Sequence, residues 1–178
     1  MVRVYAVTRG FSLVELLVAI GIVAILAAIA LPNFRSTISS TQVNSLATTL
    51  YRDLKLAQAE AIRQGKPIGL YASSNAADWS SGWYVADALG GTRIVNRDAP
   101  DPRYLVAAST GDGSAAPVAA VVFKPMGDVA GTAAQISFKT CEKNNAASAR
   151  QQILVNPSGG VMTFALPNAA ASATGCGT

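Results

Sequence analysis

One carboxylate, Glu15, lies inside an otherwise uncharged apolar run that extends from Phe11 to Leu31. An ionised carboxylate among apolar groups is costly unless a cation pairs with it and hydrogen bonds satisfy it. In an apolar helix such a residue usually has a definite functional partner. The chemistry that this position predicts is therefore ion pairing. As a helix, the run would be about 31 Å long, close to the hydrocarbon thickness of a bilayer.

Residues suited to catalysis or metal binding are sparse. Histidine is absent, which removes the commonest general base and the commonest metal ligand. The serines therefore lack a histidine partner for nucleophilic catalysis. Asp98, Asp101 and Asp112 do not have the alternating spacing of a calcium loop, and we interpret them as solvated turn residues. We predict a protein that is not an enzyme, with no metal and no cofactor.

The chain contains two cysteines, Cys141 and Cys176. In a chain sent across a membrane, such a pair predicts a disulfide in an oxidising compartment. In a chain that stays in the cytoplasm, the two residues would be unrelated thiols.

The N-terminal run permits three interpretations. Arg3 and Arg9 precede it, so the positive-inside rule leaves residues 1–10 in the cytoplasm and sends the remainder outward. The run could be a plain signal anchor. It could also be a cleaved secretory signal, because Ala28-Ile29-Ala30 resembles an A-x-A site. Glu15 counts against both, since neither gives its carboxylate a partner.

The third interpretation rests on a motif. The sequence Arg9-Gly10-Phe11-Ser12-Leu13-Val14-Glu15-Leu16-Leu17-Val18 resembles the processing motif of type IV prepilins and type II secretion pseudopilins. The resemblance implies that a prepilin peptidase cuts between Gly10 and Phe11 and that the new N-terminal Phe11 is methylated. Glu15 would then pair with the Phe11 amine of a neighbouring subunit. Pro32 also matches the class, in which a proline at this depth bends the long helix.

Beyond the apolar run the pattern predicts an α+β domain. One helical stripe continues the helix to about Gln64, where Gly65 suits a left-handed cap and Pro67 cannot continue it. The stripe consists of Val43, Leu46, Ala47, Leu50, Leu54, Ala57 and Ala61. Short strands follow. We predict strands at 68–72, 82–86, 93–95, 104–108, 118–123, 135–139, 153–156 and 161–164, with a hairpin turn at Pro157-Ser158-Gly159-Gly160.

The domain has a resemblance of its own. Leu54–Gly65, then Trp79 and Gly82-Trp83-Tyr84-Val85, resemble the GspH/FimT group of minor pilins and pseudopilins. Arg150–Val161 resembles the last hairpin of that group, and the cysteine pair fits the pilus-side FimU/FimT branch. Trp79, Trp83 and Tyr84 could stack on a ligand, but we interpret them as core and sheet-face aromatics.

Nucleic-acid binding is an alternative that the basic residues favour only weakly. Of the 14 basic residues, Arg3 and Arg9 precede the apolar run, and Glu15 is one of the 10 acidic residues. From Arg35 onward this leaves 12 basic and 9 acidic residues, a net charge of +3. The FimT branch is associated with DNA uptake and tends to carry clustered arginines in its last hairpin. Here Gly160-Val161-Met162 stands at that place, with Lys139, Lys143 and Arg150 as the nearby basic residues.

These patterns predict a leader at 1–10, a membrane and filament-core helix at 11–31, an amphipathic helix at 32–65 and a periplasmic β-rich domain at 66–178. The resemblance implies a minor pilin that primes assembly of a type IV pilus or sits at its tip, with other pilins as partners. A minor pseudopilin of a type II secretion system and a DNA receptor for transformation are the alternatives. In each case the resemblance places the chain in the inner membrane of a Gram-negative bacterium before it joins a filament.

Overall fold

The computed structural model describes residues 11–74, 77–88, 91–111, 116–143 and 149–166; for residues 29–36 only the backbone is described. The chain divides into two units, residues 1–37 and residues 38–178. One helix, α1 (Leu13–Gln64), contributes to both. The predicted leader, with Gly10 at its end, lies outside the described residues, and so do Asp112 and Cys176.

In the first unit, α1 presents its apolar side chains to the surroundings. Every side chain from Phe11 to Ala28 is exposed, and Phe11 itself is 78% exposed. No helix in the described part of the chain has both the length and the apolarity that a membrane crossing requires.

In the second unit, α1 packs through the predicted stripe. Six of its seven residues are buried, and Leu46 is partly buried against the same core. Gly65 has φ = +64°, the left-handed conformation that commonly follows a helix end, so α1 ends where the sequence predicts. The amphipathic pattern therefore fixed both the buried face and the end of the helix.

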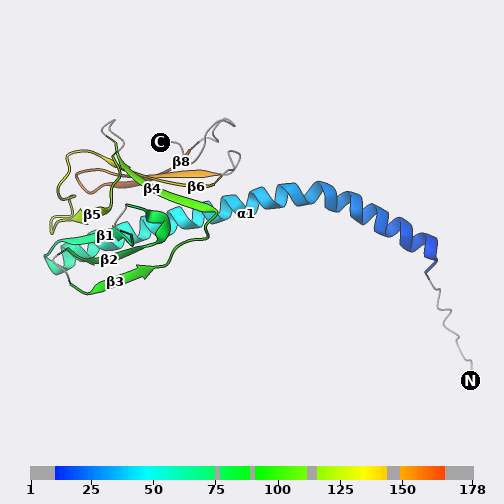
Figure 1. Cartoon of the computed structure of the whole chain (residues 1–178), viewed down its shortest axis with the longest axis horizontal. Coiled ribbons are helices and arrows are strands. Elements are labelled where there is room, and N and C mark those ends of the chain that lie inside the picture. Colours follow the sequence, from blue (N-terminus) through cyan, green and yellow to red (C-terminus); the bar gives the residue numbers. More distant parts are fainter. Residues whose placement is uncertain (1–10, 75–76, 89–90, 112–115, 144–148, 167–178) are drawn as a thin grey trace, which may run out of the picture. The chain divides into compact units, whose positions relative to one another are not determined.

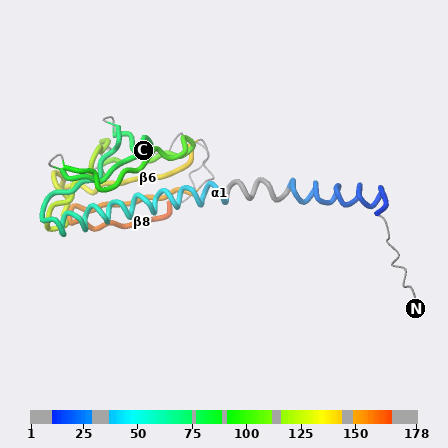
Figure 2. The backbone as a smooth tube through the Cα atoms, turned by 90° about the horizontal axis from the view of Figure 1, so that it is seen from below, coloured from blue at the N-terminus to red at the C-terminus, as the bar shows by residue number. Residues whose placement is uncertain are grey.

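Two antiparallel four-stranded sheets accompany the helix (Figure 1). The first has the order β3-β2-β1-β5 and the second the order β4-β6-β7-β8. Figure 2 shows α1 running alongside β8. The strands are β1 (Ile68–Ala72), β2 (Trp83–Asp87), β3 (Arg93–Arg97), β4 (Tyr104–Thr110), β5 (Ala120–Phe123), β6 (Ile136–Glu142), β7 (Arg150–Val155) and β8 (Val161–Leu166).

Two tryptophans anchor the core between α1 and the sheets. Trp79, in the short 3-10 helix η1 (Trp79–Ser81), meets Phe138 edge to face with ring centroids 4.8 Å apart. Its indole N–H donates to the carbonyl of Val118 at 2.6 Å. Trp83 is also buried, whereas Tyr84 stacks on Tyr71 at 5.4 Å between centroids. The interpretation of these residues as core and sheet-face aromatics is confirmed.

The α+β fold class and all eight strands are confirmed, with differences at the strand ends. β7 begins at Arg150, three residues before the predicted start, because Gln151 and Gln152 pair with β6. These polar residues carry no apolar signal, so only the sheet partner reveals them as strand. β5 begins at Ala120 because the preceding N–H of Val118 bonds to the carbonyl of Ala108 instead.

Candidate assembly site

The first candidate site is the start of α1. Leu16 donates its N–H to the carbonyl of Ser12 at 3.1 Å, which closes the first helical turn. Glu15 lies in that turn, where the positive end of the helix dipole stabilises a carboxylate. Pro32 lies within α1, but its side chain is not described, so the predicted bend stays a prediction. Cleavage between Gly10 and Phe11 and methylation of Phe11 also stay predictions.

A buried carboxylate joins α1 to the first sheet. Asp53 projects from α1 and is only 2% exposed. Its Oδ2 accepts from the Trp83 indole and from Arg97 Nε, both at 2.9 Å, and its Oδ1 accepts from Arg97 Nη2 at 3.0 Å. Arg97 is the last residue of β3. Its hydrogen bonds to Asp53 raise the pKa of the Arg97 guanidinium. The three side chains fix β2 and the edge strand β3 against the helix.

A second polar contact joins α1 to two turns. Gln58 donates from Nε2 to the carbonyls of Gly127 and Gly159, each at 2.8 Å. Gly159 has φ = +87°, and a Cβ atom on it would lie 1.9 Å from the Gly127 oxygen. The turn between β7 and β8 therefore needs glycine at this position.

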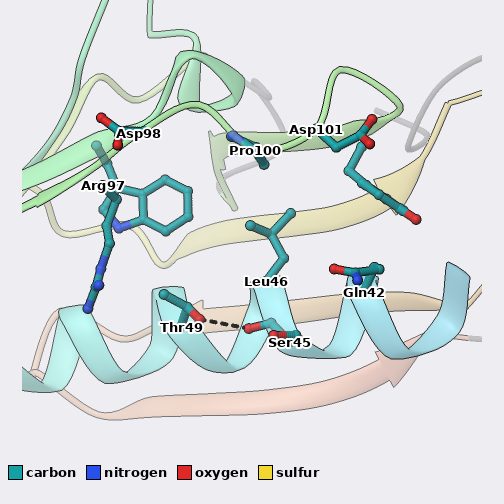
Figure 3. Close-up of a pocket in the computed structure, with 10 residues that line it drawn as sticks. Gln42, Ser45, Leu46, Thr49, Arg97, Asp98, Pro100 and Asp101 are labelled. Atoms are coloured by element: carbon teal, nitrogen blue, oxygen red, sulfur yellow. Dashed lines mark hydrogen bonds between the residues drawn. The ribbon is translucent and has the colours of Figure 1, made fainter. Parts of the chain in front are cut away.

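A groove of about 240 Å³ lies between α1 and the segment that connects β3 to β4. In Figure 3, Leu46 projects from α1 into the groove, and the Arg97 side chain runs down toward the helix. The groove is lined by Gln42, Ser45, Leu46, Thr49, Trp83, Arg97, Asp98, Pro100, Asp101 and Tyr104.

Some of the charged side chains around this groove are in ion pairs and one is not. Asp101 pairs with Arg103 at 2.8 Å, and the hydrogen bonds from Arg103 lower the pKa of Asp101 to about 2. The Arg97 guanidinium is held by Asp53. Asp98 is exposed and has no hydrogen-bond or ion-pair partner among the described residues. It stands at the rim of the groove together with Asp101 (Figure 3).

The structure brings two of the three basic residues considered for DNA binding onto one face. Lys139 pairs with Gln152 in the β6–β7 register, and Arg150 lies two residues before Gln152, so their side chains leave the same side of the sheet. Lys143 lies beyond the end of β6. Three other arginines already have partners: Arg93 lies over the Tyr84 ring at 4.0 Å, and Arg97 and Arg103 are paired with aspartates.

Cys141 lies on β6 and is buried. The β6–β7 register ends at Thr140 opposite Gln151, one residue before Cys141 on β6 and one residue after Arg150 on β7. Arg150 pairs with Leu166 at the end of β8. The end of β8 is thus two strands, or about 10 Å, from Cys141. Cys176 lies outside the described residues, but the chain of residues 167–175 can span about 30 Å. The disulfide stays a prediction, and the register supports it.

The family model described as Type II transport protein GspH matches residues 46–159, well over half of the chain. The chain belongs to the GspH family. A second model, the prokaryotic N-terminal methylation motif, matches residues 7–31, around the predicted processing site. The resemblances drawn from Arg9–Val18 and from the domain are both confirmed.

Relatives of this GspH-family chain include proteins described as fimbrial. A fimbrial protein of Pseudomonas aeruginosa is 31% identical over 117 residues, which cover 64% of this chain and 75% of the relative. The type IV major fimbrial protein FimA of Dichelobacter nodosus is 33% identical over 90 residues, which cover 49% of this chain and 55% of FimA.

Solved structures of both filament classes share the fold of this GspH-family chain. The type IV minor pilin FimU of Pseudomonas aeruginosa superposes with a TM-score of 0.57 at 17% identity, covering 75% of this chain and 95% of FimU. The minor pseudopilin EpsH of the Vibrio cholerae type II secretion system gives 0.56 at 14% identity, covering 74% of this chain and 99% of EpsH. At these identities the likeness concerns the fold.

Sequence reasoning missed Asp53 and Gln58 in this GspH-family domain. Both are polar residues within an amphipathic helix, where a solvated position is the usual interpretation. The position of Asp53 was one signal in the sequence that it is buried. Asp53 directly precedes Leu54 and lies three residues after Leu50, so it borders the buried stripe. A charge in that position indicates a buried partner.

Proposed function

We propose that this GspH-family chain is a minor pilin, a structural subunit that primes assembly of a type IV pilus or sits at its tip. The observation that carries the proposal is the exposed apolar helix from Phe11 to Ala28, joined to a GspH-family domain. An apolar surface of this extent is unfavourable in water, and lipid or neighbouring helices would bury it. The role is architectural rather than catalytic, and other pilins are the partners.

The start of α1 would perform the assembly step. Before assembly, residues 11–31 anchor the subunit in the inner membrane, with the domain in the periplasm and residues 1–10 removed by prepilin peptidase. In the filament, the Glu15 carboxylate pairs with the Phe11 amine of a neighbour. A pair of opposite charges in an apolar core is favourable only when its geometry is correct. The pair therefore sets the register between subunits.

A minor pseudopilin of a type II secretion system is the second candidate. The description of the family model and the EpsH fold favour it. The fimbrial relatives, at 31% and 33% identity, favour the pilus, because their sequence likeness is well above that of either solved structure. We therefore place the pilus first.

The proposal is tested on filaments sheared from the parent bacterium. We expect the chain in the sheared fraction at a low ratio to the major subunit, with a mature N-terminus at methylated Phe11 by mass spectrometry. Loss of the gene should reduce the number of surface pili and leave type II secretion intact. A secretion defect with normal piliation would instead support the pseudopilin, and a mature chain that starts at Leu31 would contradict both.

A further inference from the structure

The groove between α1 and the β3–β4 connection has a local charge that its own residues do not neutralise. Two of its charged groups are already satisfied: Arg97 by the buried Asp53, and Asp101 by Arg103. Asp98 at the rim is unpaired among the described residues. From Arg35 onward the chain carries a net charge of +3, so this site is opposite in sign to the net charge of the domain.

The remaining lining has two kinds of surface. Leu46 and Pro100 provide apolar contact, and Gln42, Ser45 and Thr49 provide oxygen acceptors along one face of α1 (Figure 3). Tyr104 also lines the groove. A long aliphatic stem that ends in a cation matches this combination, because the methylene groups cover apolar surface while the charged head reaches polar partners. A volume of about 240 Å³ admits one side chain but no folded element.

We propose that this groove receives a lysine or arginine side chain of a neighbouring filament subunit. The proposal rests on the function proposed above, since it requires a neighbour. Gln42, Ser45 and Thr49 line the groove from the part of α1 that belongs to the second unit, and the exposed Gln42 and Ser45 leave this wall open to a neighbour. Charge complementarity with Asp98 selects the basic side chain, and such complementarity contributes mainly to specificity and to the rate of association.

The first test changes the rim charge and measures incorporation into sheared filaments, normalised to the amount of subunit in the membrane fraction. Asp98→Asn should lower incorporation roughly threefold to fivefold, as expected for an exposed ion pair, and Asp98→Lys about tenfold or more because like charges then repel. Glu60→Gln is the matched control. It removes one carboxylate from α1, outside the groove, and should leave incorporation unchanged.

The second test identifies the occupant. A photo-crosslinking amino acid at Gln42 in the full-length chain should capture a filament subunit at a peptide that contains lysine or arginine. Changing that basic residue to glutamate should restore incorporation of Asp98→Lys. The inference is overturned if Asp98→Lys incorporates like wild type, or if the captured peptide contains no basic residue. Absence of the wild-type chain from filaments would instead refute the proposed function.

Discussion

At the scale of single residues, Asp53 shows how one carboxylate can hold three elements together. It is buried on α1, yet three hydrogen bonds from two side chains, one of them a cation, satisfy both its oxygens. A buried charge without partners would be strongly destabilising, and here the partners come from β2 and β3. The position of β3, and with it one wall of the groove, depends on this carboxylate.

Replacing Asp53 with alanine should therefore destabilise the domain. The Trp83 N–H would lose its acceptor in a buried site, and we expect a cost of about 2–3 kcal/mol, since the half-exposed Arg97 can return to water. Trp79 and Trp83 are both buried and are the only tryptophans of the chain, so their fluorescence during denaturant unfolding of the full-length protein in detergent measures the loss. Asp98→Asn is the control and should change stability by less than about 0.5 kcal/mol. Equal stability of Asp53→Ala and wild type would refute this role.

Glu15 is expected to act between subunits instead of within one. Glu15→Ala should leave the protein in the membrane, because an apolar substitution favours insertion, but should weaken its incorporation into filaments. Immunoblots of the membrane fraction and of sheared filaments measure the two effects separately. Val14→Ala, a neighbouring change that keeps the carboxylate, should incorporate normally. Wild-type levels of Glu15→Ala in filaments would show that no pairing takes place.

At the scale of elements, α1 is the helix that both sheets contact. The helix contacts the first sheet through Asp53 and the turns at the end of both sheets through Gln58. At the start of its packed part, Ser39 donates to Glu142 at the end of β6. Polar contacts thus accompany the apolar stripe along its length. They specify where β2, β3, the end of β6 and the two turns lie along the helix, which apolar contacts alone define less sharply.

The turn between β7 and β8 gives a test at this scale. Gly159→Ala should cost at least about 3 kcal/mol, because the new Cβ would meet the Gly127 carbonyl in addition to the strain of a positive φ. Gly131→Ala is the matched control: Gly131 has φ = +75° but open space around it, so only the strain of about 1–2 kcal/mol remains. Tryptophan fluorescence during unfolding reports both. Similar losses for the two variants would mean that the turn can shift away from the contact.

At the scale of the whole molecule, several basic side chains of the described residues already have partners. Arg97 and Arg103 are paired with aspartates, Arg93 lies on Tyr84, and Lys66 pairs with Asp87. Lys139 and Arg150 share one face of the second sheet, on strands that are hydrogen-bonded neighbours. Tight non-specific binding of DNA requires several clustered cations that release counterions. In the described part of the second sheet, the register places two cations, Lys139 and Arg150, on one face.

We therefore expect no appreciable DNA binding by the full-length protein in detergent at about 150 mM salt, and only weak binding at low salt. Fluorescence anisotropy with a labelled duplex at two salt concentrations measures this. A variant in which Lys139, Lys143 and Arg150 are changed to glutamate is the control and should remove the weak binding. Micromolar affinity near physiological salt that this variant loses would promote the DNA receptor to the leading function.

The sequence alone determined the features that local pattern controls. The spacing of Leu50, Leu54 and Ala57 identified the buried face of α1, Gly65 marked its end, and the motif around Glu15 indicated the N-terminal methylation motif. Each depends on residues close together in the chain, whose periodicity reports which side is buried.

The tertiary structure decided which partners meet. Asp53 and Arg97 are 44 residues apart, and Gln58 and Gly159 are 101 apart. Such pairs follow from the order of strands in two sheets, and strand order depends on the packing of the whole domain because no local pattern encodes it. The groove at Asp98 arises for the same reason, since its walls come from a helix and a loop that only the folded domain brings together.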